Sequence, residues 1–421
     1  MLTRRRLLKG AAMTGLAAVA THLPLPAFAA GRTLKIGFVT PTTGPLAIFA
    51  EPDGFVLDQV RAALAEGLDI GGTRYPVEII VKDSQSSSNR ASSVAQELIL
   101  EHEVDILCAS ATPDTTNPVA DQAEINGVPC ITNDTPWQPH FFGRGGDPAK
   151  GFDYTYHFFW GLEDIIAVFM SQWEGVATNK VVGAMWPNDP DGNGWSHPER
   201  GFPPVMQKAG FTLVDPGRYQ NGSDDFSAQI QAFKQAGVEI VSGVMIPPDF
   251  TTFWTQAAQQ GFAPKVVNVA KASEFPQAMA ALGPRAEALS VEVWWHRNFP
   301  YASSLTGQSC AALADAYSAA TGKPWTMPLG AKHALFEVVI DALKRAEDLD
   351  DADSIAAAIK ATKLGTVFGP VDWSNGPVPN VSKTPLAGGQ WRLEAGQPVL
   401  DIVTNPGRPE IALTAAPRPI A

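Results

Sequence analysis

Polar side chains follow two apolar runs of this chain, at the point where each run ends. Residues 106–116 read ILCASATPDTT, and the next run, VPCITNDTPW, breaks in the same way at Asn133, Asp134 and Thr135. Such residues also cap helices, so a single occurrence would have a structural explanation. Two strands that end alike favour one wall of a small-molecule site, where hydroxyl and amide groups hydrogen-bond a ligand.

Common motifs of catalytic, nucleotide-binding and redox sites are absent from the sequence. There is no G-x-S-x-G, no Walker A loop, no G-x-G-x-x-G and no C-x-x-C, and the seven histidines are scattered. DPDGNG at 189–194 matches the first half of a calcium loop, but Arg200 stands where that loop needs a bidentate Glu. We therefore expect a flexible loop there, no metal, no cofactor and no enzyme. An exported enzyme with a site assembled across domains is the competing interpretation.

The three cysteines leave two states open. Cys108 and Cys130 lie at matching places on two expected neighbouring strands, so they could form a disulfide in an oxidising compartment. Buried free thiols are the alternative, because neighbouring parallel strands often point their side chains apart.

Charge and composition restrict the class of protein. The 421 residues are 45% apolar and 18% charged, which suits two or three globular domains. A formal charge of −12 argues against nucleic acid as a partner, because phosphate binding needs clustered Lys and Arg.

The first thirty residues form a separate segment. TRRRLLKG precedes an apolar stretch that closes on Ala27, Phe28 and Ala29, an A-x-A cleavage pattern. The order Thr-Arg-Arg-x-Leu-Leu-Lys resembles a twin-arginine export signal, and an N-terminal membrane anchor is the weaker alternative because the stretch is short and polar. We expect residues 1–30 to be removed and the protein to be periplasmic.

The remaining chain alternates strands with helices. TLKIGFVTP, YPVEIIVKDSQ, DILCAS and VPCIT have strand composition and are separated by helical segments, and the pattern starts again near residue 153. Alternation with near-continuous Val and Ile runs predicts an α/β fold with parallel sheets covered on both faces. Ligands bind such sheets beyond the carboxyl ends of the strands, where Ser110, Thr112, Asn133 and Thr135 are expected to lie.

Taken in order, these segments resemble a known family. The export signal, TLKIGFVTPTTGPLAIFA, the two polar strand ends and NDPDGNGW look like a periplasmic solute-binding protein of the branched-chain amino acid ABC-transporter type. The resemblance implies a type I periplasmic binding protein fold, in which two Rossmann-like lobes with parallel central sheets are joined by three crossovers. Lobe 1 would comprise residues 31–152 and 289–366, and lobe 2 residues 153–288 and 367–421, with ALSVEVWW and TVFGPVDW as the later crossovers.

The resemblance also implies partners and a mechanism. A small ligand would be trapped between the lobes by hinge closure and delivered to the membrane permease subunits of an ABC importer by a monomeric protein. A sensing module for a membrane receptor is the alternative with the same fold.

Ligand contacts transfer from the family by position. The expected contacts are Thr43 in the first loop, Ser110, Ala111 and Thr112 in the second, Asn133, Asp134 and Thr135 in the third, and Asn193, Trp195 and Lys271 from the second lobe. Trp137 and Phe159 are expected to add aromatic walls. The family places an acid that holds an amino acid's ammonium group where this chain has Lys271, with Glu274 three residues later. The sequence therefore favours a small carboxylate, with aromatic ones included, over a free α-amino acid.

Overall fold

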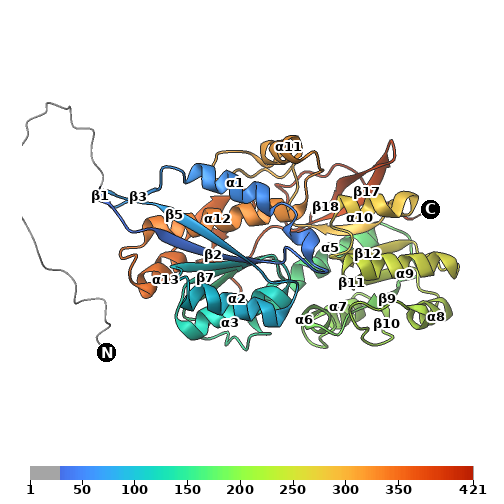
Figure 1. The fold of residues 1–421 in the computed structure, drawn as a ribbon. Coiled ribbons are helices and arrows are strands. Elements are labelled where there is room, and N and C mark those ends of the chain that lie inside the picture. Colours follow the sequence, from blue (N-terminus) through green and yellow to red (C-terminus); the bar gives the residue numbers. More distant parts are fainter. Residues whose placement is uncertain (1–28, 421) are drawn as a thin grey trace, which may run out of the picture.

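The computed structural model describes residues 29–420, and the fold is drawn in Figure 1. The predicted export signal lies outside the described residues, apart from Ala29 and Ala30. Within residues 29–420, no helix combines the length and the apolar composition that crossing a bilayer requires.

The first lobe is built on a six-stranded parallel sheet with the order β16-β8-β7-β6-β2-β5. Its strands are β2 (Leu34–Thr40), β5 (Val77–Asp83), β6 (Ile106–Ser110), β7 (Cys130–Asn133), β8 (Thr155–Phe158) and β16 (Val381–Ser382). Its helices are α1 (Asp53–Ala63), α2 (Ser88–Leu100), α3 (Pro113–Asn126), α4 (Trp137–Phe141), α11 (Cys310–Thr321), α12 (Met327–Arg345) and α13 (Ala352–Lys360), with the 3-10 turns η2 (Ala47–Ala50) and η4 (Trp373–Asn375). Two small sheets, β1 (Ala29–Ala30) with β4 (Thr73–Tyr75) and β3 (Leu68–Ile70), and β14 (Lys363–Thr366) with β15 (Gly369–Asp372), complete it.

The second lobe has a seven-stranded sheet with the order β10-β9-β11-β12-β13-β17-β18. Its strands are β9 (Val181–Met185), β10 (Thr212–Val214), β11 (Ile240–Val244), β12 (Val266–Ala270), β13 (Ser290–Val293), β17 (Ala387–Glu394) and β18 (Gln397–Thr404). Its helices are α5 (Leu162–Glu174), α6 (Pro190–Trp195), α7 (Phe202–Lys208), α8 (Ser227–Ala236), α9 (Pro247–Gln259) and α10 (Pro276–Leu282), with the 3-10 turn η3 (Gly283–Ala286). The sheet is parallel from β10 to β13, and the β17–β18 hairpin extends it antiparallel at one edge.

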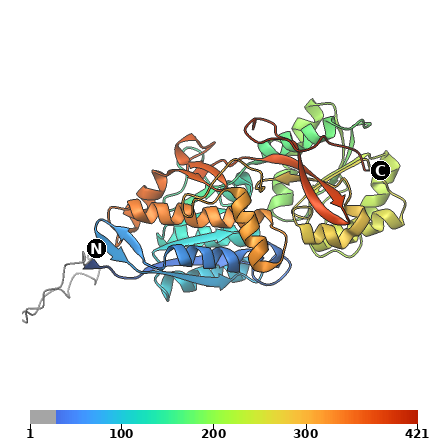
Figure 2. The ribbon, with the colours of Figure 1, turned by 90° about the horizontal axis from the view of Figure 1, so that it is seen from above.

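The predicted α/β organisation with two lobes and parallel central sheets is confirmed. Figure 2 shows the lobes end to end, with the orange helices of residues 310–360 on the lobe of the N-terminal strands and the red C-terminal hairpin on the other. The Pro-rich tail is extended and tied to the second lobe, since Ile420 N donates to Lys265 O at 2.8 Å and Arg418 N to Gln390 at 3.1 Å.

Strand pairing places the three crossovers at positions that differ from the predicted boundaries. The strand β8 pairs with β7, β13 with β12, and β16 with β8, so the chain crosses between lobes at 159–161, 294–309 and 383–386. The segment TVFGPVDW does not cross, because it contributes to the β14–β15 hairpin. The sequence pattern starts a second unit near residue 153, but β8 pairs with β7 and so still belongs to the first sheet.

The cysteine register resolves the two thiol states. Cys130 pairs with Leu107, and Cys108 with Ile131, so the two sulfurs lie on opposite faces of the sheet. Cys108 packs into the core beneath α1 and α12, whereas Cys130 packs under α2 and α3. All three cysteines are buried and free.

Candidate ligand-binding site

One pocket is lined by side chains of both lobes and by two crossovers. The space between its walls, including the part that is open to solvent, is about 340 Å³. The lining residues are Phe49, Thr112, Pro113, Asp134, Pro136, Phe159, Trp160, Asp191, Trp195, Val244, Ala270, Lys271, Glu274, Glu292 and Trp294. The pocket lies beyond the carboxyl ends of β6, β7, β11 and β12, as expected for open α/β sheets.

Thr112 forms the hydrogen-bonding part of the first lobe's wall. It precedes α3 as the N-cap, yet its hydroxyl makes no capping hydrogen bond. Thr112 is 2% exposed and its Oγ1 has no hydrogen-bond partner. Because the N-terminus of a helix attracts anions, this end of the pocket is suited to a carboxylate.

Asp134 stands beside Thr112 at the end of β7. Burial and the nearby Glu274 raise the pKa of Asp134 well above its ordinary value, while Lys332 and Ser110 oppose the shift. The Ser110 hydroxyl donates to Asp134 Oδ2 at 3.5 Å, at the limit of a hydrogen bond. Burial therefore favours the neutral form of the Asp134 carboxyl group.

The second lobe contributes an ion pair. Lys271 Nζ lies 2.5 Å from Asp191 Oδ2, and Asp191 comes from α6, the DPDGNG segment. Burial raises the pKa of Asp191 to about 6, although Lys271 opposes this. Burial lowers the pKa of Lys271, but Asp191, Asp189 and Asp114 outweigh burial and raise it. The ammonium group of Lys271 is thus charged and already neutralised by its neighbour.

Glu274 and Glu292 form a carboxyl pair at the same end of the pocket. They are 4% and 0% exposed, and Lys271 N donates to Glu274 Oε1 at 3.1 Å. Burial raises the pKa of both groups, and the pKa of Glu292 more because Glu274 lies next to it. Burial therefore favours the neutral form of Glu292 most strongly, and Glu274 Oε2 has no hydrogen-bond partner.

The backbone is strained at one position on each side of the pocket. Asp134 has a φ of 62° and Lys271 a φ of 63°, both in the left-handed region that non-glycine residues rarely adopt. Each residue follows a parallel strand and lines the pocket. Strain of this kind clusters at ligand sites because surrounding structure must hold it.

Aromatic side chains close the remaining sides. Phe159 packs on Trp160 at 4.9 Å and on Trp294 at 5.4 Å between ring centroids, and all three line the pocket. The indole Nε1 of Trp160 and that of Trp195 are buried without a partner. The walls therefore combine flat apolar faces with unused donors, as in sites for small polar molecules that carry an apolar body.

Five of the twelve predicted contacts line the pocket: Thr112, Asp134, Phe159, Trp195 and Lys271. The other seven lie beside it or bind other groups. Asn133 Nδ2 donates to Ala331 O at 2.8 Å, Thr135 Oγ1 to Ala111 O at 3.0 Å, and Trp137 Nε1 to Glu163 at 3.1 Å. Thr43 is exposed and donates to Asp83 at 2.6 Å, Ser110 contacts Asp134, and Asn193 lies on α6.

Phe49 and Glu292 are pocket residues that the pattern did not predict. Glu292 stands between Val291 and Val293 in the buried strand β13. A lone acid in an apolar strand was a usable signal, because a buried carboxyl needs a partner. Phe49 had no such signal, since an aromatic residue in GPLAIFA suits an ordinary core.

No metal site accompanies the pocket. The described part of the chain contains no group of three or more His, Cys, Asp or Glu side chains placed to hold a metal ion. In the DPDGNG segment, Asp189 accepts from Gly192 N at 2.8 Å as a helix cap, and Asp191 pairs with Lys271.

Comparison with known proteins identifies the family. A sequence model of the periplasmic binding protein family matches residues 33–387. The chain belongs to this family. No curated protein matches it in sequence.

Solved periplasmic binding proteins share its fold. A leucine-binding protein from Thermotoga maritima is 19% identical, with 89% of this chain and 99% of that one covered and a TM-score of 0.71. A branched-chain amino acid transporter substrate-binding protein from Streptococcus pneumoniae, in complex with isoleucine, is 19% identical over 88% and 99% of the two chains, with a TM-score of 0.68. An ABC-transporter solute-binding protein from Rhodopseudomonas palustris, in complex with 3,4-dihydroxybenzoic acid, is 18% identical over 89% and 99%, with a TM-score of 0.69.

Proposed function

We propose that this protein is the extracytoplasmic solute-binding component of an ABC importer and that it holds one small ligand between its lobes by hinge closure. The observation that carries the proposal is the interlobe pocket, where Thr112, Trp160, Trp195 and Glu274 keep buried polar atoms without partners. Unpaired buried polar groups cost free energy, so a ligand that satisfies them stabilises the closed protein.

Two groups that line the pocket favour a ligand with two different polar groups. A carboxylate suits Thr112 and the N-terminus of α3. Glu274 is an acceptor that suits an ammonium or hydroxyl group. The ligand class is therefore a small carboxylate that also carries a donor, which includes amino acids and hydroxylated aromatic acids.

The ion pair between Lys271 and Asp191 removes the reason for which the sequence disfavoured an amino acid as the ligand. A free lysine would repel an ammonium group strongly in a closed cleft. Asp191 at 2.5 Å neutralises that charge, and Glu274 adds a carboxyl group beside it. An amino acid is thus compatible with the pocket, and the carboxylate of either ligand class would bind at Thr112 and the N-terminus of α3.

The other parts of the proposal rest on the sequence. The twin-arginine pattern supports export to the periplasm, and membrane permease subunits of the importer are the proposed partners of a monomeric protein. We propose that the chain passes from one lobe to the other at three crossovers, which are residues 159–161, 294–309 and 383–386. No catalytic step is assigned to the pocket.

Calorimetry and thermal shift with four compounds test the ligand class. We expect leucine, phenylalanine or 4-hydroxybenzoate to bind, and phenylpropionate, which lacks the second polar group, to bind weakly. A ligand at a hundred times its Kd should stabilise the protein by about 2.7 kcal/mol. Glu274→Gln should lower the affinity for the compound that binds.

The control is Glu287→Gln, the same change on the same lobe at a residue that pairs with Arg418 outside the pocket. It should leave affinity unchanged. Tight phenylpropionate binding that survives Glu274→Gln would contradict the proposed ligand class, and turnover of a substrate with a stoichiometric cofactor would contradict the binding function.

A further inference from the structure

The turn between β14 and β15 touches all three crossovers. We name residues 366–369, Thr366 to Gly369, the hinge wedge. Phe368 lies 5.9 Å from Phe159 of the first crossover and 6.0 Å from Trp294 of the second, measured between ring centroids. At Gly369 a Cβ atom would come within 2.7 Å of the Pro385 ring of the third crossover. The hinge wedge therefore lies where the lobes must pivot.

The hinge wedge also supports the ligand pocket. Phe159 and Trp294, the two aromatic residues that Phe368 contacts, both line that pocket. The wedge itself is a stiff turn, because Thr366 Oγ1 donates to Gly369 O at 2.7 Å and accepts from Phe368 N at 3.1 Å. A shift of the wedge would therefore move two walls of the pocket.

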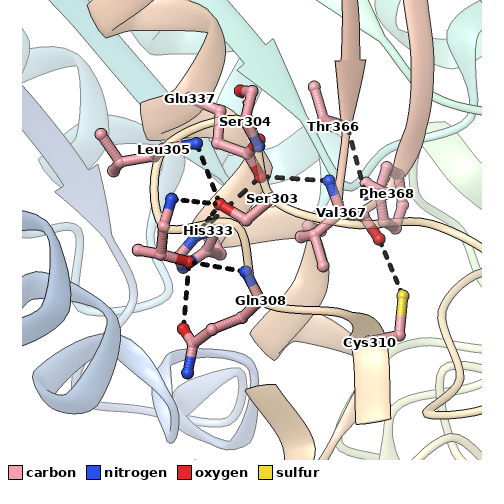
Figure 3. Close-up of polar contacts among 12 residues, drawn as sticks. Ser303, Ser304, Leu305, Gln308, Cys310, His333, Glu337, Thr366, Val367 and Phe368 are labelled. Atoms are coloured by element: carbon pink, nitrogen blue, oxygen red, sulfur yellow. Dashed lines mark hydrogen bonds and ion pairs between the residues drawn. The ribbon is translucent and has the colours of Figure 1, made fainter. Parts of the chain in front are cut away.

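A buried carboxylate binds the wedge to the first lobe, beside the thiol of Cys310, which donates to Val367 O at 3.2 Å. Figure 3 shows Glu337 of α12 between Val367 and Ser304. Glu337 Oε1 accepts from Val367 N at 3.1 Å, and Oε2 accepts from Ser304 N at 2.5 Å and from Ser304 Oγ at 2.6 Å. Ser304 belongs to the second crossover, so one side chain holds both that crossover and the wedge on α12.

The groups around Glu337 are neutral. On its own helix, His333 Nε2 lies 3.9 Å from Glu337 Oε1 and 2.8 Å from Ser303 Oγ, and burial lowers the pKa of His333 to about 4. From α11, Cys310 is a protonated thiol, because burial raises its pKa to about 12. Among the described residues, no lysine or arginine nitrogen lies within 4 Å of the Glu337 carboxyl.

This arrangement is not a catalytic triad. Ser303 and Glu337 both approach the same His333 nitrogen, so the acid does not orient the ring from the opposite side. Ser303, His333 and Glu337 are also buried. The role of the Glu337 carboxylate is therefore to accept the three hydrogen bonds from the second crossover and the wedge.

We propose that Glu337 is a positioning residue for lobe closure, and that protonation of its carboxylate releases the second crossover and the hinge wedge from α12. Hydrogen bonds to a charged carboxylate are about twice as strong as neutral ones, and a protonated carboxyl has one acceptor fewer for the same three donors. Burial raises the pKa of Glu337 to about 7, so this change falls within the range that a periplasmic protein meets. The role in closure rests on the proposed function, whereas the release itself does not require any ligand.

Local release and global stability respond to pH with opposite signs. The pKa of Glu337 in the folded chain lies above its ordinary value, so protonation stabilises the folded state as the pH falls through 7. The hydrogen bonds at Ser304 and Val367 weaken over the same interval. Faster local exchange at pH 6 therefore has a source other than global unfolding.

Hydrogen exchange of the unliganded protein tests the proposal. After correction for the intrinsic rate, protection of the Ser304 and Val367 amides should fall about tenfold from pH 8 to pH 6, the effect of one charge-assisted hydrogen bond. In Glu337→Gln, the protection of these two amides should be low at both pH 8 and pH 6. Ser304→Ala, an exposed position that tolerates truncation, should show a smaller pH effect at Val367.

The matched control is Asp249→Asn. Burial raises the pKa of Asp249 to about 6, and this residue lies in the first turn of α9 in the second lobe. It should keep the wild-type pH response at Ser304 and Val367. Equal protection at pH 8 and pH 6 in the wild type, or an unchanged pH response in Glu337→Gln, would overturn the proposal. Failure of every ligand in calorimetry would count against the proposed function and leave this result unaffected.

Discussion

Two threonines at neighbouring strand ends have different roles. The hydroxyl of Thr112 neither caps α3 nor finds another partner, although it is buried. The hydroxyl of Thr135 donates to Ala111 O at 3.0 Å and is therefore already used. Both residues are buried threonines, so the same substitution at each can separate an effect on ligand binding from an effect on stability.

Thr112→Val should lower ligand affinity about tenfold or more, because it removes a donor that suits a carboxylate. Stability without ligand should change by less than about 0.5 kcal/mol, since no hydrogen bond is lost. Thr135→Val should instead cost about 1 kcal/mol of stability and leave the affinity near the wild-type value. Calorimetry with the tightest compound of the panel and urea unfolding measure the two quantities. The reverse pattern would show that Thr112 is structural.

Between the lobes, a small apolar cluster joins elements that belong to neither core. It consists of Leu46, Phe49 and Ala111 from the first lobe, and Ile246 and Phe275 from the second. Phe49 and Phe275 meet edge to face with 4.9 Å between ring centroids. Because the cluster exists only when the lobes are together, its apolar burial stabilises the closed state.

Phe275→Leu should therefore speed ligand release by several-fold up to about tenfold, since an edge-to-face pair contributes about 0.5–1.5 kcal/mol. The association rate should change little, because ligand enters before the cluster forms. Stopped-flow kinetics measure both rates. Phe233→Leu, in the core of the second lobe, is the control and should lower stability without changing release. Equal release rates in both variants would exclude a role for the cluster.

Much of each lobe could be predicted from the sequence, because alternating strand and helix patterns are local. The polar strand ends around Thr112 and Asp134 were found for the same reason. The third crossover was not: TVFGPVDW folds with the adjacent residues 363–366 into a hairpin, and the chain crosses only after β16 has paired with the distant strand β8. Phe49, Asp191 and Glu292 line the pocket from three separate elements. Their spacing along the chain does not show that they lie close together in the fold.

The whole molecule closes over its pocket through contacts at the rim. Gln277 Nε2 of the second lobe donates to Glu51 Oε2 of the first at 2.6 Å. Arg200 of the second lobe lies over the Phe142 ring of the first, 4.4 Å from its centroid. The lining residues are mostly buried in this arrangement, so we expect a ligand to enter after the lobes separate.

A reversible link across the rim tests this requirement. The chain's three cysteines are buried, so Glu51→Cys with Gln277→Cys places two accessible thiols where the lobes meet. A reducible crosslinker as long as the two original side chains should trap the closed form. We expect the crosslinked protein to give a compact small-angle scattering profile without ligand and to bind nothing added from solution. Reduction should restore binding and a profile that contracts when ligand is added. Either cysteine alone, treated with the same reagent, should behave as the wild type. Ligand binding by the crosslinked double variant would show that access does not depend on hinge opening.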